Sequence, residues 1–324
     1  MPIRMNANFL GYALSTCGLL AAALTAQSTP MHRADVAADP NFVLHFDFDS
    51  MRPTTIGKHV LAEMDKPETQ GIMSTFQTVL NLDPRKQLHG LTLYSTGKAP
   101  EDGVVLAYAD FEPERLITLA KAAKEYQSIT YGQYTIHSWV DEQKLGRVGG
   151  NRRVYAAFQG EQLVVLAQQE ARINRALDVL DHKVPNLTST SLFSQVGASA
   201  STGFIQGAAR KMDIPDFAPN AALLRMAKTA RVEIGERQGQ LKATVGLEAS
   251  DEDSSQQMAS VGEGLVALLK MQQDNPNAVK LAEGLSIRQD GNSVVATLAI
   301  PAAQAIELMK ADAVRRMFTK ANGK

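Results

Sequence analysis

The sequence predicts an α+β protein of two similar halves, each a mainly antiparallel sheet built from β-hairpin-plus-helix modules with helices packed on one face. One observation is a design that recurs four times: two apolar or β-branched runs joined by a turn and followed by an amphipathic helix. A second is its placement, with two modules before a Ser- and Thr-rich stretch at 186–202 and two after it. Hairpins that alternate with helices of one apolar stripe are typical of α+β folds.

The clearest module occupies residues 153–180. Its two strands flank Gly160, which can supply the positive φ of a tight turn. A helix follows, because apolar residues recur at helical spacing: Ile173, Ala176, Leu177 and Leu180. The second strand, 162–168, is apolar on both faces, so we expect it inside a covered sheet.

The other elements follow from the same patterns. Residues 42–49 alternate between an apolar set (Phe42, Leu44, Phe46, Phe48) and a set that contains His45, Asp47 and Asp49. This alternation predicts a half-buried opening strand with the polar set in water. Two helices are expected near 53–61 and 72–80, and three further modules at 88–123, 231–269 and 285–317. Asp290-Gly291 between apolar runs is a strong hairpin signal.

This order suggests a domain organisation. We expect a flexible spacer at 27–40, a first half at 41–185, a joint at 186–202, a second half at 203–318 and a tail at 319–324. The repeated order is interpreted as an internal duplication. The alternative is that unrelated copies of a common hairpin–helix motif follow one another.

The first 26 residues predict export. Arg4 is the only charge before an uncharged run from Phe9 to Ala26, which is typical of a signal peptide cleaved in the region of Leu24 to Ala26. The competing interpretation is an uncleaved anchor, since the run approaches the length that spans a bilayer. Cys17 loosely resembles a lipoprotein cysteine, but Thr16 is a poor residue before it, so a lipid anchor through Cys17 is the weaker interpretation.

Charge and composition narrow the classes of partner. The chain has 33 basic and 34 acidic residues without a basic cluster, which argues against a nucleic-acid-binding protein. We expect a protein or an apolar small molecule as partner, and no membrane span once the leader is removed. The sequence leaves the oligomeric state open.

His45, Asp47 and Asp49 are the sharpest chemical candidates. Alternation places them about 6–7 Å apart on one strand face, where they could bind a metal ion together with other elements. The simpler interpretation is a solvated face opposite the phenylalanines. Ser95 to Lys98 has the Ser-x-x-Lys spacing but lies in a hairpin connection, and the sequence contains no zinc-protease, nucleophile-elbow or paired-cysteine motif. We therefore predict no catalytic residue, no cofactor and no resident metal.

Several of these segments together resemble a known group of proteins. They are an opening strand like 42–49, the stretch Tyr131-Gly132-Gln133-Tyr134, the hairpin Tyr155 to Val165, the helix Ile173 to Leu180, and Ser191-Leu192-Phe193. Over about Asn41–Met212 the chain resembles a broad family of uncharacterised bacterial exported proteins, a domain of unknown function. The resemblance implies a bacterial envelope protein, and it transfers no functional residue.

The sequence as a whole predicts an exported, non-catalytic binding or interaction protein of the bacterial periplasm or cell envelope. One alternative is a carrier or sensor of an apolar ligand held between helices and sheet. The other is a metal-dependent enzyme that uses His45, Asp47 and Asp49.

Overall fold

The structure is a computed structural model that describes residues 29–141, 152–197, 203–210, 227–272 and 274–310. The predicted signal peptide, its cleavage region from Leu24 to Ala26, Cys17 and the tail at 319–324 lie outside the described residues. Within the described ranges, none of the helices combines the length and the apolarity that a bilayer crossing requires.

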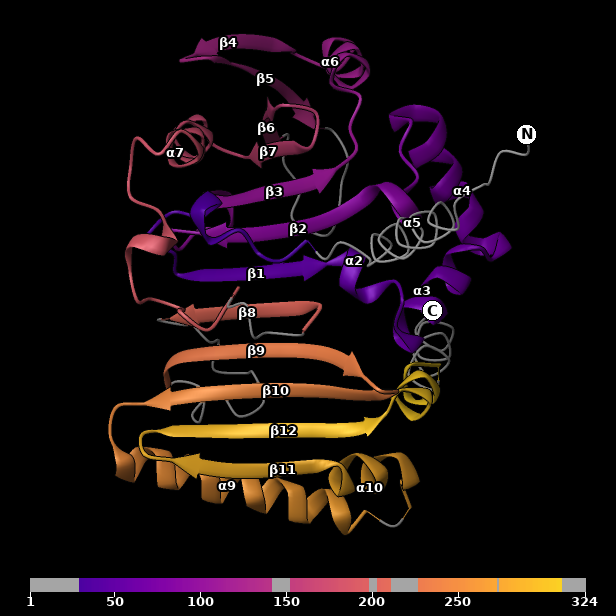
Figure 1. Ribbon diagram of the computed structural model, residues 1–324, viewed down its shortest axis with the longest axis vertical. Helices are drawn as coiled ribbons and strands as arrows, with labels where there is room; N and C mark the ends of the chain where they lie inside the picture. Colours follow the sequence, from indigo (N-terminus) through magenta and orange to yellow (C-terminus); the bar gives the residue numbers. More distant parts are fainter. Residues whose placement is uncertain (1–28, 142–151, 198–202, 211–226, 273, 311–324) are drawn as a thin grey trace, which may run out of the picture.

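The described strands form one continuous sheet in which every neighbouring pair is antiparallel (Figure 1). Its strand order is β11-β12-β10-β9-β8-β1-β2-β3-β7-β6-β5-β4. The strands are β1 (Phe42–Asp47), β2 (Leu88–Ser95), β3 (Gly103–Ala109), β4 (Gln127–Tyr131), β5 (Tyr134–Asp141), β6 (Arg152–Gln159), β7 (Leu163–Ala167), β8 (Ile205–Arg210), β9 (Ala227–Arg237), β10 (Gln240–Ala249), β11 (Leu285–Asp290) and β12 (Ser293–Pro301).

Two similar halves meet at the centre of this sheet, where β1 pairs with β8. Outward from β1 the order is β2, β3, β7, β6, and outward from β8 it is β9, β10, β12, β11. In each half the outer hairpin therefore joins the inner one through its second strand. The hairpin β4–β5 extends the first half alone. The prediction of two similar, mainly antiparallel halves is confirmed, and the halves share one continuous sheet.

The helices lie between and around these strands. They are α2 (Phe48–Met51), α3 (Thr55–Met64), α4 (Pro67–Thr75), a π-helical turn η2 (Phe76–Leu80), α5 (Pro84–Gln87), α6 (Pro113–Lys121), α7 (Glu170–Leu180), α9 (Glu252–Lys270) and α10 (Pro276–Glu283), with three short 3-10 turns η1 (Arg33–Asp35), η3 (Pro100–Asp102) and η4 (Leu187–Ser189). Residues 302–310 are also helical. Asp251 caps α9 by accepting the Ser254 N–H at 2.7 Å, as its acidic start predicts.

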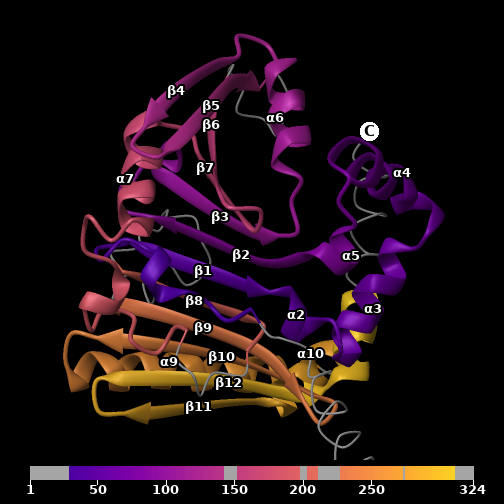
Figure 2. The ribbon, with the colours of Figure 1, turned by 45° about the horizontal axis from the view of Figure 1, so that its top comes forward.

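The first half departs from the expected single covered face. The buried face of α7 packs against Leu106 and Val165, whereas α6 lies over Ala107 and Val164, which point to the other side of the sheet. Figure 2 shows α6 and α7 on opposite sides of the strands β5 to β7. The physical reason is the composition of β7, since a strand that is apolar on both faces needs cover on both.

Residues 29–40 are part of the core rather than the flexible spacer that we expected at 27–40. Met31, Val36 and Ala37 are buried in the cluster that α7 also joins. Backbone bonds tie this segment to the region before and within the predicted joint: Ala38 N–H donates to Pro185 O, and Leu187 N–H to Val36 O at 2.8 Å. The sequence did not predict this burial, because the segment has few apolar residues and is anchored in the core by only these three side chains.

Arg33 fixes the loop that follows α7. Its guanidinium donates to the carbonyl oxygens of Leu187 (2.8 Å), Val196 (2.9 Å) and Leu192 (3.1 Å), and also to that of Phe193. Residues 186–197 of the predicted joint are thereby held against the sheet.

Candidate functional site

The structure does not place His45, Asp47 and Asp49 on one wet strand face. Strand β1 ends at Asp47, and Asp49 lies one residue into α2. His45 is fully buried and Asp47 is 4% exposed, whereas Phe42 on the opposite face is 39% exposed. The expected assignment of buried and wet faces is therefore reversed, because α7 and residues 29–40 cover the side that carries His45.

The ring of His45 is saturated by two protein partners. Its Nε2 lies 2.9 Å from the carbonyl oxygen of Thr29, and its Nδ1 lies 2.9 Å from the hydroxyl of Thr92. A carbonyl only accepts, so Nε2 carries the proton and Nδ1 accepts from Thr92. Burial lowers the pKa of His45, which keeps the ring in this neutral form.

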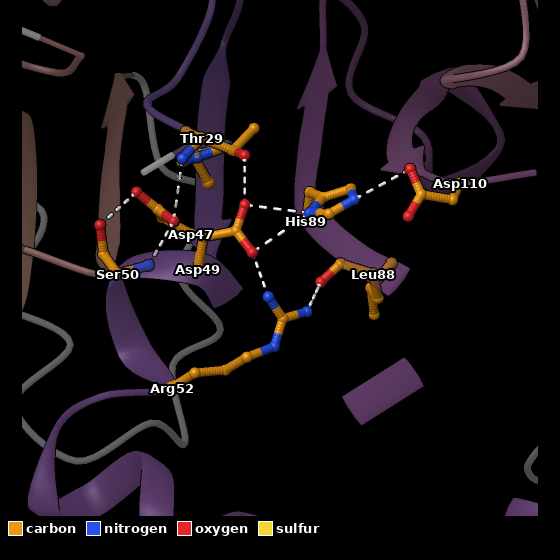
Figure 3. Close-up of polar contacts among 9 residues, drawn as sticks. Thr29, Asp47, Asp49, Ser50, Arg52, Leu88, His89 and Asp110 are labelled. Carbon is orange, nitrogen blue, oxygen red and sulfur yellow. Dashed lines mark hydrogen bonds and ion pairs between the residues drawn. The ribbon is translucent and has the colours of Figure 1, made fainter. Parts of the chain in front are cut away.

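Asp47 acts as the N-terminal cap of α2. Its carboxylate accepts from the backbone N–H of Ser50 at 2.8 Å, from the Ser50 hydroxyl at 2.6 Å and from the N–H of Thr29 at 3.3 Å (Figure 3). A short side chain at this position is the usual partner for the free amides of a first helical turn.

Asp49 links three segments in the same region. It accepts from the hydroxyl of Thr29 at 2.7 Å and from the guanidinium of Arg52, and it lies 3.0 Å from Nδ1 of His89. Figure 3 shows His89 between Asp49 and Asp110, with the second ring nitrogen 3.2 Å from Asp110. In the described part of the chain, no group of three or more His, Cys, Asp or Glu side chains is arranged to hold a metal ion. His45, Asp47 and Asp49, the candidate metal ligands of the sequence analysis, thus tie Thr29 and α2 to the sheet.

A separate apolar cleft lies between α6 and the face of the sheet that carries Ala107 and Val164. Its volume is about 550 Å³. The sheet contributes side chains from β3, β5, β6 and β7, and the opposite wall comes from η2 and α6. These side chains are Val79, Leu80, Ala107, Phe111, Leu116, Ile117, Leu119, Ala120, Ala123, His137, Trp139, Ala156, Phe158, Val164 and Leu166.

The rim of the cleft exposes large apolar side chains. Val79 is 40% exposed and Leu119 is 38% exposed. Phe111 and Phe158 meet edge to face inside it, with ring centroids 6.5 Å apart. Removing apolar surface from water is favourable by roughly 25 cal/mol per Å². A hydrocarbon that covers this cleft should therefore bind favourably.

His137 is the ionisable side chain that lines the cleft. Its Nδ1 lies 2.8 Å from the hydroxyl of Tyr126, and the two rings stack with centroids 6.0 Å apart. Burial, and secondly the positive charge of Lys121, lower the pKa of His137. The imidazole is therefore neutral near pH 7, and the cleft interior carries no charge from it.

The sequence contained part of the signal for this cleft. The module predicted at 88–123 ends in a helix with an apolar stripe, and the strand predicted at 162–168, apolar on both faces, was expected inside a covered sheet. The structure shows that α6 stands off the sheet and leaves a cavity there. The contributions of His137, Trp139 and Phe158 were not predicted, because they come from strands whose outer face has no marker in the sequence.

Comparison with known proteins gives only distant likenesses. No family model matches the chain, and no curated protein matches it. The chain is similar to two crystal forms of the protein TP0453, forms III and I. Sequence identity is 9% and 8% and the TM-scores are 0.48 and 0.47, over 87% of this chain and 98% of TP0453 in both comparisons.

Proposed function

We propose that this protein is an exported, non-catalytic binding protein of the cell envelope that holds an apolar ligand in the cleft between α6 and the sheet. The observation that carries the proposal is the cleft itself, which is lined almost entirely by apolar side chains and has exposed apolar residues at its rim. The leader predicted at residues 1–26 supports the export part.

The chemistry of the lining selects the ligand class. A volume of about 550 Å³ lies in the range of small-molecule sites. A polar group placed there without a partner would cost about 2–7 kcal/mol, so a hydrocarbon such as an acyl chain fits best. His137 Nδ1 already faces the Tyr126 hydroxyl, which leaves Nε2 as the ring atom for a polar end of the ligand.

Two measurements test the proposal. Native mass spectrometry of the protein purified from its own host should show a co-purified apolar molecule. The delipidated protein should then bind oleate, measured by calorimetric titration. An apo mass together with no oleate binding would contradict the proposal.

A matched pair of variants locates the ligand. Ala120→Trp fills the cleft from α6 and should weaken oleate binding at least tenfold. Thr118→Trp places the same side chain on the exposed side of the same helix and should leave the affinity unchanged. Equal affinities for the two variants would place the ligand elsewhere.

A further inference from the structure

A second groove, about 550 Å³ in volume, lies on the opposite face of the sheet, in the second half. Its floor is formed by the polar face of β9, β10, β12 and β11, and its wall by the loop 191–196. Arg33 donates hydrogen bonds to three carbonyl oxygens of that loop, so the wall is held in a fixed position.

Two arginines face each other across this floor. Arg231 pairs with Gly246, Gly246 with Val295, and Val295 with Arg288, so the four residues form one row across four strands. Three strand spacings of about 4.8 Å separate the two arginine Cα atoms by roughly 14 Å. An extended arginine covers about half of that span.

Gly246 gives Arg231 its path along the row. A Cβ atom added at Gly246 would lie 2.8 Å from Cγ and 3.1 Å from Cδ of Arg231. The side chain of Arg231 therefore lies over the glycine and directs its guanidinium towards the middle of the row. Within the described residues, neither Arg231 nor Arg288 has a hydrogen bond or an ion pair from its side chain.

The next row of the same face is acidic. Thr229, Glu248, Ser293 and Asp290 are register partners there, two residues along the strands and so about 6–7 Å from the arginine row. Glu248 accepts from the Thr229 hydroxyl at 2.8 Å, and across the described chain neither acid is ion-paired. Two cations and two anions thus line one groove without neutralising each other.

We propose that this groove binds a zwitterionic small molecule, with its phosphate or carboxylate between Arg231 and Arg288 and its ammonium group at Glu248 and Asp290. Guanidinium groups bind such oxyanions with two parallel, charge-assisted hydrogen bonds. A polyanion such as a nucleic acid is excluded, because the acidic row would repel it. The site is independent of the apolar cleft, which lies on the other face.

Calorimetric titration of the full chain tests the site with O-phosphoethanolamine and inorganic phosphate as probes. Phosphoethanolamine should bind saturably and more tightly than phosphate. Arg231→Gln and Arg288→Gln should each weaken both probes at least tenfold. Glu248→Gln should weaken phosphoethanolamine and leave phosphate unchanged. Arg288 is exposed, so its variant retains the fold and decides the test on its own if Arg231→Gln disturbs the sheet.

Two further variants serve as controls. Lys242→Gln removes an exposed cation from the same face outside the groove and should leave both affinities unchanged. Gly246→Ala keeps every charge but displaces Arg231, so it should weaken both probes. The proposal is overturned if phosphoethanolamine does not bind saturably, or if Lys242→Gln weakens binding as much as Arg288→Gln. Equal effects of Glu248→Gln on the two probes would overturn the assignment of the ammonium group.

Discussion

The carbonyl oxygen of Thr29 accepts a hydrogen bond from Nε2 of the fully buried His45, at 2.9 Å. Thr29 also donates its N–H to Asp47 and its hydroxyl to Asp49. All three side chains that the sequence offered as metal ligands therefore bind one residue of the N-terminal segment. These three side chains hold Thr29 in place, and their lone pairs accept hydrogen bonds from other groups of the protein.

Replacing Thr92 by valine should destabilise the protein by about 1–3 kcal/mol. The change keeps the shape of the side chain but leaves Nδ1 of the buried His45 without a donor. Urea unfolding followed by circular dichroism measures the loss. Thr130→Val on the exposed strand β4 is the matched control and should change stability by no more than about 0.5 kcal/mol. Equal stabilities of the two variants would show that the bond to His45 has no net value.

Arg33→Lys should destabilise the protein by about 2 kcal/mol or more. A lysine has one ammonium group and cannot reach the four carbonyl oxygens that the planar guanidinium spans. Amide hydrogen exchange should show faster exchange in residues 187–196, in particular at the Val196 N–H that donates to Phe193 O. Arg237→Lys, at the exposed end of β9, should leave the exchange unchanged. Unaltered protection in Arg33→Lys would refute the role of Arg33.

Local turn chemistry made much of the fold predictable. The hairpin glycines Gly160 and Gly291 adopt positive φ, as the sequence indicated, and so does Gly239 in the turn between β9 and β10. A turn at Gly132, where φ is 60°, joins β4 to β5, and β4 was not expected from the sequence. The Gly132 signal was present in the sequence, but the polar strand before it lacked the apolar alternation that marks a half-buried strand.

The buried side of β1 was not predictable from the sequence. Alternation separates Phe42 from Val43 and His45, but it does not say which set is covered. The cover comes from residues 29–40, α7 and the loop held by Arg33, which are brought together by contacts more than 150 residues apart in the chain. The cleft under α6 was hidden for the same reason, because its lining comes from six separate elements.

Export can be tested directly at the N-terminus. If the leader is a signal peptide, the protein recovered from its host should begin at or near Gln27, because the uncharged run ends at the small residue Ala26 and polar residues follow. Mass spectrometry of the N-terminal peptide and fractionation of the envelope measure this. Cys17→Ser should have no effect on processing, whereas a loss of processing would favour lipidation. An intact N-terminus beginning at Met1 would favour the uncleaved anchor.

Stability should fall as the pH drops below about 6.5. Burial lowers the folded-state pKa of both His45 and His137, so the unfolded chain, with an ordinary value near 6.5, binds more protons in this window. Their stabilising effect is complete above that pH and is lost towards each folded-state pKa, with a slope of up to about 1.4 kcal/mol per pH unit for each group. His32, whose pKa is raised by its hydrogen bond to Asp35, opposes this trend weakly because it is largely exposed. In urea unfolding, His137→Gln should reduce the slope of stability against pH between pH 5 and about 6.5. The exposed His182→Asn is the control and should leave this slope unchanged. If His137→Gln showed the slope of the unaltered protein, the contribution assigned to His137 would be contradicted.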